Sequence, residues 1–516
     1  MKLNRQSLIK GIGAAGVTLS FAGLVSANEQ GNTRFIVTGR RGVTNQLNRA
    51  GYEIQHTLAG GMVHLVEGPA DGNLSRIPGV REYARDIKLS FEEPERKVQF
   101  DDEQVEQLLP PIDERLFPWQ WDKDVTNVPD ANEVATGAGS TIAVLDTGVG
   151  ITHPNLVENV NVADGRRFRF YELGEHLDEA GPAVDRIQGG SGLVEVPVDH
   201  DDEELGTQLV DEQPLVNDVQ GHGTNVSGIA AAKPIGPTIS PFSITGTAPD
   251  AEIVPLRVFY WIEADDEDDD GEVIEDVATL ITTTGDILLA IDYAARIGAD
   301  VANLSLGTAP LPPQVNALGI RVAYEQVIQH AVRQGTVIVA SAGNAAANLQ
   351  QGGFFSIPNS VAGAMSISAT GPNDLLAFYS NFGTNEIDVG APGGGYETLA
   401  KTLEEEFSEV DWPFPFNLVL NTFVVDSTGD SILNAPSYAW FAGTSMAAPQ
   451  VAGAAALVRE MQPNANARQV EKAIKQGADL ARGRNDPHLG AGRLNALNTV
   501  QEAEGGNPTR GRGRQN

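Results

Sequence analysis

Short apolar runs rich in β-branched residues alternate with stretches of helical periodicity from about residue 119 to residue 503. A strand that is apolar along its whole length is buried on both faces, since an exposed face would place polar residues at every second position. We predict strands at 142–145, 253–258, 301–306, 336–340 and 364–369, and helices near 223–232, 286–297, 315–334, 446–461 and 467–477. The pattern predicts an α/β domain whose mainly parallel sheet is covered by helices on both faces.

Three acidic segments interrupt this alternation, near residues 164–218, 263–276 and 396–436. Because they are acidic and break the strand–helix order, we predict that all three are surface loops. The acidic run 265–270 has enough charge to hold a cation. It lacks the regular ligand spacing of an EF-hand loop, so a solvated acidic loop is the favoured interpretation.

Residues 33–98 carry a different pattern, in the order βαββαβ. Strands are predicted at 34–38, 52–57, 62–67 and 80–89, with helices at 43–50 and 69–77. This order predicts a small ferredoxin-like α+β domain in front of the larger one. Residues 99–118 are acidic and read as a linker between two folded units, and the low-complexity tail 504–516 is predicted to be disordered.

The first 27 residues have the organisation of a secretory signal peptide, with a charged start, a mild apolar run and small residues at the end. The segment 4–10 resembles a twin-arginine signal in which Gln6 replaces the second arginine, which leaves the export route open. The apolar run is too short to span a membrane, and no other stretch approaches 18 consecutive apolar residues. We therefore predict a secreted, extracellular protein without a membrane anchor.

The chain has no cysteine and a net charge of −34, from 35 Lys and Arg against 69 Asp and Glu. These counts exclude disulfides, thiolate nucleophiles and cysteine-bound zinc, and they argue against a nucleic-acid partner. Residues 1–98 carry a charge of +4, whereas residues 99–516 carry −38. An acidic surface with 9 Lys against 26 Arg is typical of proteins from high salt, where ions screen self-repulsion. An ordinary acidic protein is the alternative.

Two candidate catalytic residues lie at the end of a strand and the start of a helix. Asp146 directly follows the predicted strand 142–145, and functional groups gather at the carboxyl ends of parallel strands. His222 lies between two glycines at the start of an alanine-rich helix. Histidine titrates near neutrality, which suits a general base. Taken singly, Asp146 is better explained as an aspartate that caps a turn, and His222 is equally well explained as an ordinary surface histidine.

Two further candidates could stabilise or carry negative charge. Ser445 opens an apolar helix, whose N-terminal amides favour the charge of an acyl-transfer intermediate. Pro449 is tolerable in that helix because we place it in the first turn, where no internal partner exists for its missing N–H. Asn344 follows another buried strand, so its amide could bind an oxyanion beside the Ser445 N–H. A helix cap and a turn residue are the ordinary alternatives.

In their order and local contexts these residues resemble the subtilisin-like serine proteases, or subtilases. The matching segments are Val144-Leu145-Asp146-Thr147-Gly148, Gly221-His222-Gly223-Thr224, Ser341-Ala342-Gly343-Asn344 and Gly443-Thr444-Ser445-Met446. The resemblance implies a catalytic triad in which Asp146 is the acid, His222 the base and Ser445 the nucleophile. It also makes Asn344 the oxyanion donor.

The resemblance also implies polypeptide substrates and chemistry that needs no cofactor. The substrate-binding residues that it implies are Leu304, Ser305, Leu306, Gly307, Ser341 and Gly343. Residues 33–98 take the role of a pro-domain, which inhibits the enzyme and assists its folding. We therefore expect a secreted, halophilic serine endopeptidase, similar in character to the halolysin-like proteases of halophilic archaea. It would be made as a precursor and cleave itself between residues 93 and 119.

The sequence departs from the family pattern at three positions. Asn225 and Gln450 stand where the family usually has histidines, and we predict that their side chains contact each other across two helices. Asn155 stands where a calcium-liganding aspartate is common, and an uncharged ligand argues against a structural calcium ion there. Two rival interpretations stay open. One is a catalytically silent subtilase fold that serves as a binding module, and the other is a related protease with a Glu-Asp-Ser site, which the glycines around His222 disfavour.

Overall fold

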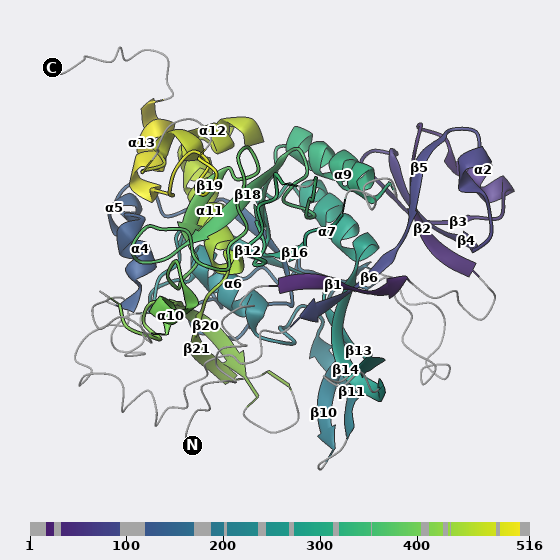
Figure 1. Cartoon of the computed structure of the whole chain (residues 1–516), viewed down its shortest axis with the longest axis horizontal. Coiled ribbons are helices and arrows are strands. Elements are labelled where there is room, and N and C mark those ends of the chain that lie inside the picture. The colour runs from purple at the N-terminus through teal and green to yellow at the C-terminus, as the bar shows by residue number, and fades with distance from the viewer. Residues whose placement is uncertain are drawn as a thin grey trace.

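The computed structural model describes residues 17–24, 32–92, 119–169, 187–200, 204–235, 244–267, 273–312, 319–351, 353–403, 412–426, 432–433, 435–480 and 486–505. The predicted linker 99–118, most of the predicted signal peptide and most of the predicted tail lie outside these residues. The described residues form a large domain that begins near residue 119 and a small N-terminal domain, residues 32–92 (Figure 1).

An eight-stranded sheet forms the centre of the large domain. Its order is β19-β18-β17-β15-β7-β12-β8-β9, and all neighbouring strands are parallel except β8 and β9. The strands are β7 (Thr141–Asp146), β8 (Arg166–Phe168), β9 (Ile187–Gln188), β12 (Glu252–Arg257), β15 (Val301–Leu304), β17 (Val337–Ser341), β18 (Ala364–Thr370) and β19 (Val389–Pro392). The prediction of a mainly parallel sheet is confirmed. Four of the predicted strands lie in it, and the fifth, 301–306, lies in it only as far as Leu304.

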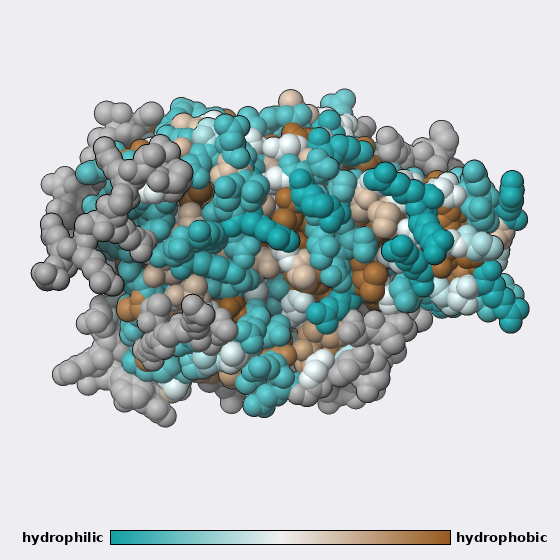
Figure 2. Space-filling view, turned by 90° about the horizontal axis from the view of Figure 1, so that it is seen from above, coloured by the Kyte–Doolittle hydropathy of each residue, from teal (hydrophilic) through white to brown (hydrophobic). Residues whose placement is uncertain are grey.

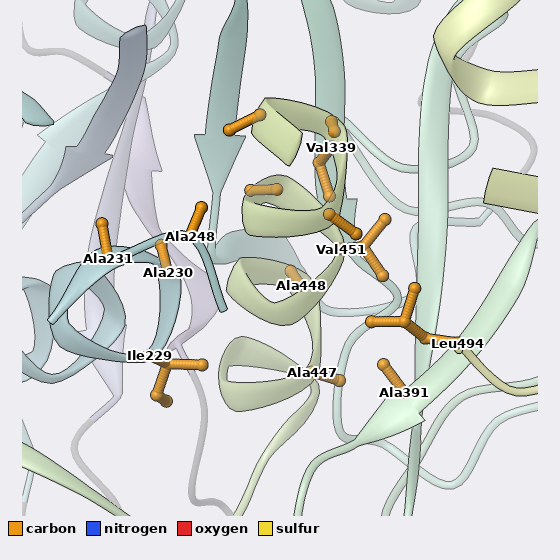
Figure 3. Packing of buried hydrophobic residues seen from close by; sticks show 14 of the residues in the cluster. Ile229, Ala230, Ala231, Ala248, Val339, Ala391, Ala447, Ala448, Val451 and Leu494 are labelled. Carbon is orange, nitrogen blue, oxygen red and sulfur yellow. The ribbon is translucent and has the colours of Figure 1, made fainter. Parts of the chain in front are cut away.

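Helices cover both faces of this sheet. The first face packs on α6 (His222–Ala231), α11 (Thr444–Met461), α12 (Ala467–Gly477) and α13 (Ala496–Gly505), and the second packs on α7 (Thr284–Arg296) and α9 (Ile320–Gln334). Strand β17 shows why its sequence is apolar throughout: Val337 and Val339 belong to the first core, and Ile338 and Ala340 to the second. Figure 3 shows α11 at close range, with alanines on its surface and on α6. Small side chains let these helices approach closely.

The N-terminal domain is a four-stranded antiparallel sheet of order β3-β4-β2-β5. Its elements are β2 (Asn32–Gly39), α2 (Thr44–Arg49), β3 (Glu53–Leu58), β4 (Val63–Pro69) and β5 (Val80–Arg85). The predicted ferredoxin-like domain is confirmed, but its second helix, predicted at 69–77, is wrong. Only a 3-10 turn, η1 (Leu74–Arg76), forms, because Pro69 still belongs to β4 and Gly72 follows it. The predicted strand 80–89 is divided at Asp86 into β5 and β6 (Ile87–Glu92).

The open face of the N-terminal sheet packs on helices α7 and α9. Ile36 and Leu65 share a core with Ile287 and Val327 of those helices. The backbone N–H of Ala59 donates to Oδ1 of Asp292 in α7 at 2.7 Å. The N-terminal domain therefore covers one side of the large domain, as Figure 1 shows.

The acidic segments predicted as loops contain β-hairpins, so that prediction is wrong. The hairpins are β10 (Ser191–His200) with β11 (Glu204–Pro214), β13 (Tyr260–Glu267) with β14 (Val273–Thr283), and β20 (Val419–Val425) with β21 (Ala435–Phe441), and the third segment also holds the short helix α10 (Leu399–Thr402). In β10, Val194 and Val196 are buried and alternate with Glu195, which is the period of two of a β-strand. The acidic run 265–270 begins in β13 and continues outside the described residues.

Hydrophilic residues cover most of the coloured face in Figure 2, with hydrophobic residues in small, separate groups. Within the described segments, none of the helices combines the length and apolar character that crossing a membrane requires.

Candidate active site

The structure brings Asp146 and His222 together at the carboxyl end of β7. Nδ1 of His222 lies 2.8 Å from Oδ1 of Asp146, and the two side chains are 6% and 0% exposed. The same oxygen accepts the backbone N–H of Thr147 at 2.8 Å. Because a carboxylate only accepts hydrogen bonds, Nδ1 of the imidazole carries the proton, and Nε2 is the nitrogen that can take one up.

Two glycines allow His222 to approach Asp146. A Cβ atom at Gly223 would lie 2.1 Å from the carbonyl oxygen of Gly148 and 3.0 Å from Cβ of Asp146. Gly221 has a φ of +104°, and a Cβ there would meet the ring of Phe423 at 2.2 Å. No other residue type fits either position without moving the histidine.

A second buried carboxylate, Asp218, organises the turn before His222. Its Oδ1 accepts the hydroxyl of Thr147 and the N–H groups of Gln220 and Gly221 at 2.7–3.0 Å. Its Oδ2 accepts the N–H and the hydroxyl of Thr224 at 2.8 and 2.5 Å, which caps the start of α6. The sequence analysis missed Asp218, although an aspartate four residues before Gly-flanked His222 is a signal that could have indicated it.

Ser445 lies in the first turn of α11 and is tied to Ser305 in both directions. Its Oγ donates to the carbonyl oxygen of Ser305 at 3.0 Å, and Oγ of Ser305 donates to the carbonyl oxygen of Ser445 at 2.8 Å. Pro449 lies in the second turn, so its predicted place in the first turn is wrong. Its missing N–H would have bonded to the Ser445 carbonyl, and Ser305 supplies the donor instead.

Asn344 is fixed by the residue before Ser445. Its Oδ1 accepts both the N–H and the hydroxyl of Thr444, each at 2.9 Å. Its Nδ2 is buried and has no hydrogen-bond partner within the described residues. An amide held by its oxygen presents its N–H groups for another acceptor.

The six predicted substrate-binding residues lie at the ends of neighbouring strands and are buried. Leu304 ends β15, Ser305 follows it, and Leu306 and Gly307 lie in β16 (Leu306–Thr308). Ser341 ends β17, and Gly343 follows with a φ of +96°. Strand β16 is the edge of a second sheet, of order β13-β14-β6-β1-β16, in which it pairs in parallel with β1 (Val17–Leu24).

Asn225 and Gln450 do not form the contact predicted between them. Nδ2 of Asn225 donates to the carbonyl oxygen of Thr422 in β20 at 3.1 Å, because that hairpin packs directly on α6. Gln450 binds Asp122 and Lys123. Each of the two amides therefore forms its hydrogen bonds with a different segment, Asn225 with β20 and Gln450 with residues 122 and 123.

The amide of Asn155 is engaged by protein groups. Oδ1 accepts the hydroxyl of Tyr438 at 2.6 Å, and Nδ2 donates to the carbonyl oxygen of Lys233 at 2.9 Å. Burial lowers the pKa of the neighbouring His153 to about 4, so this histidine is neutral at pH 7. These residues do not fit a calcium site, and among the described residues no group of three His, Asp or Glu side chains could hold a metal ion.

A buried Asp–His pair, a serine at a helix N-terminus and a fixed amide beside it, all at one end of a parallel sheet, define a serine-protease type of site. The Subtilase family model matches residues 137–492, and the chain belongs to that family.

The chain is 30% identical over 411 residues to the extracellular protease of Xanthomonas campestris pv. campestris, which covers 78% of this chain and 59% of that protein. It is 27% identical over 391 residues to thermitase of Thermoactinomyces vulgaris, covering 76% and 99% of the two chains. Among solved structures, a protease from Pseudoalteromonas arctica matches with a TM-score of 0.51 and 26% identity over 76% of this chain and all of the other. The epidermin leader peptide processing serine protease of Staphylococcus aureus matches with a TM-score of 0.62 over 91% and 98%, and at 19% identity it shows the fold alone.

Proposed function

We propose that the protein is a secreted serine endopeptidase made as a precursor, with Asp146, His222 and Ser445 as its triad. The observation that carries the proposal is the state of Asn344. Thr444 holds its oxygen with two hydrogen bonds, and its buried Nδ2 has no partner within the described part of the chain. An unsatisfied buried donor costs about 1–3 kcal/mol, so a donor left this way beside a serine supports binding of an oxyanion.

The proposed reaction assigns one step to each of these residues. Nε2 of His222 takes the proton of the Ser445 hydroxyl as this oxygen attacks the scissile carbonyl. Asp146, 2.8 Å from Nδ1, holds the imidazole in the required tautomer and stabilises the imidazolium. The Nδ2 of Asn344 and the backbone N–H of Ser445 donate to the tetrahedral oxyanion. The imidazolium then protonates the leaving amine, and water hydrolyses the acyl-enzyme by the same steps. The proposed chemistry needs no cofactor.

Polypeptide substrates are supported by the strand edges at the site. Strands β14 and β16 lie in one sheet, with β6 and β1 between them. Strand β6 pairs with residues 281–283 of β14, and β1 pairs with residues 306–308 of β16. An extended peptide can bind such an edge through its backbone. Because β1 belongs to the predicted signal peptide, its removal would open the edge of β16 to a substrate.

The proposed role of residues 33–98 as an inhibitory pro-domain is supported by β6 and Asp86. Strand β6 pairs with β14, so the end of the N-terminal domain lies along the proposed cleft. Oδ1 of Asp86 accepts the N–H of Gly285 at 2.9 Å in the first turn of α7, which ties the end of the N-terminal domain to a helix of the large domain. Self-cleavage is proposed between residues 93 and 119, a stretch outside the described residues.

The proposal also includes secretion of the protein and its adaptation to high salt. The small domain side of the chain is slightly positive and the rest carries −38, so their attraction weakens as salt rises. At molar salt, the contact would depend on the apolar packing on α7 and α9. A likeness to halolysins is part of this proposal.

The test combines activity with labelling of the serine. The wild type and Ser445→Ala are expressed with the full chain and compared in molar KCl by casein hydrolysis, labelling with a fluorophosphonate and N-terminal sequencing. We expect the wild type to be labelled and to begin after residue 92, and Ser445→Ala to be unlabelled and unprocessed. A folded wild type that is neither labelled nor active would identify a silent binding module. Activity that persists well below pH 6 would contradict the histidine base.

A further inference from the structure

Four consecutive residues at the start of the large domain are buried, although three of them are polar. Gln120, Asp122 and Lys123 are each 0% exposed and Trp121 is 1% exposed. The last three belong to the short helix α4 (Trp121–Val125). A lysine is almost never fully buried without a partner, so the contacts of Lys123 need an explanation.

The ammonium of Lys123 binds groups from four different segments. Nζ donates to the carbonyl oxygen of Ile229 at 3.1 Å, to Oε1 of Gln450 at 3.0 Å and to Oγ1 of Thr247 at 3.3 Å. It also forms an ion pair with Oδ2 of Asp122 at 3.3 Å. Gln450 completes the network, since its Nε2 donates to the same carboxylate oxygen at 2.8 Å.

Two of these contacts are with the helices of the proposed catalytic residues. Ile229 lies in the last turn of α6, the helix that His222 begins, where the carbonyl groups and the helix dipole favour a positive charge. Gln450 lies five residues after Ser445 in α11. The helices cross closely nearby, because a Cβ at Gly453 would meet Cβ of Thr247 at 2.6 Å and the carbonyl oxygen of Ala230 at 2.9 Å.

We propose that Lys123 is a positioning residue, whose ammonium fixes the base helix α6 against the nucleophile helix α11. The proposal rests on the function proposed above. Lys123 touches neither substrate nor the reacting atoms; it acts through the two helices. Without it, His222 and Ser445 keep their own local contacts, and α6 and α11 keep their close packing near Gly453 but lose the polar link between them.

The energetics favour a geometric role over a purely stabilising one. Burial lowers the pKa of Lys123, and the Asp122 carboxylate opposes that shift. Because desolvation offsets most of the attraction in a buried ion pair, such pairs add little stability over an apolar core. What they do supply is direction, since Nζ of Lys123 and Nε2 of Gln450 both contact Oδ2 of Asp122, while Oδ1 of that carboxylate has no partner among the described residues. The arrangement here ties α4, α6 and α11 together.

The test compares Lys123→Met with the double variant Asp122→Asn/Lys123→Met and with a matched control, Lys233→Met. The double variant removes both charges, so it avoids leaving Asp122 buried and unpaired. Lys233 pairs with Glu158 and Asp250 on the surface, where its side chain is 40% exposed. All are made in the full chain, and kcat, KM, the pH profile of kcat/KM and the fluorophosphonate labelling rate are measured below the melting temperature of each.

We expect both Lys123 variants to lose about tenfold or more in kcat and in labelling rate, with KM within about twofold, because small displacements of reacting groups are costly. Lys233→Met should match the wild type. A folded Lys123 variant with the kcat, labelling rate and pH profile of the wild type would overturn the proposal. Failure of both variants to fold in any salt would also overturn it, since Lys123 would then be needed for stability alone. If the wild type itself showed no Ser445-dependent labelling, the proposed function would fail, and this inference with it.

Discussion

The exchange of hydrogen bonds between Ser305 and Ser445 predicts an energetic coupling between Ser305 and Pro449. Ser305→Ala removes the donor to the Ser445 carbonyl, which lies 2.8 Å from Oγ of Ser305. It also removes the acceptor of Asn303, whose Nδ2 donates to the same hydroxyl at 3.0 Å. Pro449→Ala restores the helical N–H that would bond to the Ser445 carbonyl.

The expected magnitude follows from counting the groups left unsatisfied. Each buried group without a partner costs about 1–3 kcal/mol, and two groups lose their partner, so Ser305→Ala should destabilise the protein by about 2–6 kcal/mol. In the double variant only Asn303 stays unsatisfied, because the new N–H at position 449 serves the carbonyl of residue 445. The double variant should therefore be about 1–3 kcal/mol more stable than the sum of the two single effects predicts.

The assay is a double-mutant cycle by urea unfolding in a Ser445→Ala background, which keeps the backbone carbonyl and prevents autolysis. Ser368→Ala is the matched control, since Oγ of Ser368 donates to the carbonyl oxygen of His488 at 2.6 Å. Its effect should simply add to that of Pro449→Ala. If the Ser305 and Pro449 effects also add within about 0.5 kcal/mol, the reasoning about the Ser445 carbonyl is refuted.

Three further predictions concern the oxyanion, pH and salt. Asn344→Ala should lower kcat about 10²- to 10³-fold with little change in KM, the range known for one oxyanion donor in subtilisin, as steady-state kinetics on a peptide substrate would reveal. Burial raises the pKa of Asp86 from 3.8 to about 6, so its contribution to precursor stability is complete below about pH 4 and lost as pH rises through about 6. Asp86→Asn should remove this part of the pH dependence in calorimetry of the Ser445→Ala precursor. The same precursor should melt at higher temperature as KCl rises to molar concentration, and an unchanged melting temperature would contradict the salt-adapted surface.

The parts of the molecule that sequence patterns predicted are those that local rules determine. Strand β17 is apolar at every position because both of its faces are buried, and the pattern of residues 336–340 reports this directly. Asp146 and His222 could be placed because each follows a recognisable strand end or opens a glycine-flanked helix. The hairpins were missed because the loop prediction rested on acidic composition, although Val194, Glu195 and Val196 already alternate with a period of two.

The parts that could not be predicted depend on contacts between distant segments. The segment 120–123 gives no sequence signal of its burial, since three of its four residues are polar. Its partner Gln450 is more than 300 residues away in the sequence. Similarly, the Thr422 carbonyl that binds Asn225 belongs to a hairpin predicted as a loop. The predicted contact between Asn225 and Gln450 is therefore wrong, because each amide has its partner in a different segment of the chain.

The identity of residue 450 can be explained from these contacts. Its side chain must accept a hydrogen bond from the ammonium of Lys123 and donate one to the carboxylate of Asp122, which is the adjacent residue. Glutamine presents an acceptor and a donor at the same end of its side chain, so it can bind both neighbours at once. Histidine, usual here in subtilases, holds its two nitrogens on different sides of a ring. A histidine would therefore bind either Lys123 or Asp122 and leave the other charge without this partner. The buried pair Asp122–Lys123 thus explains the amide at position 450.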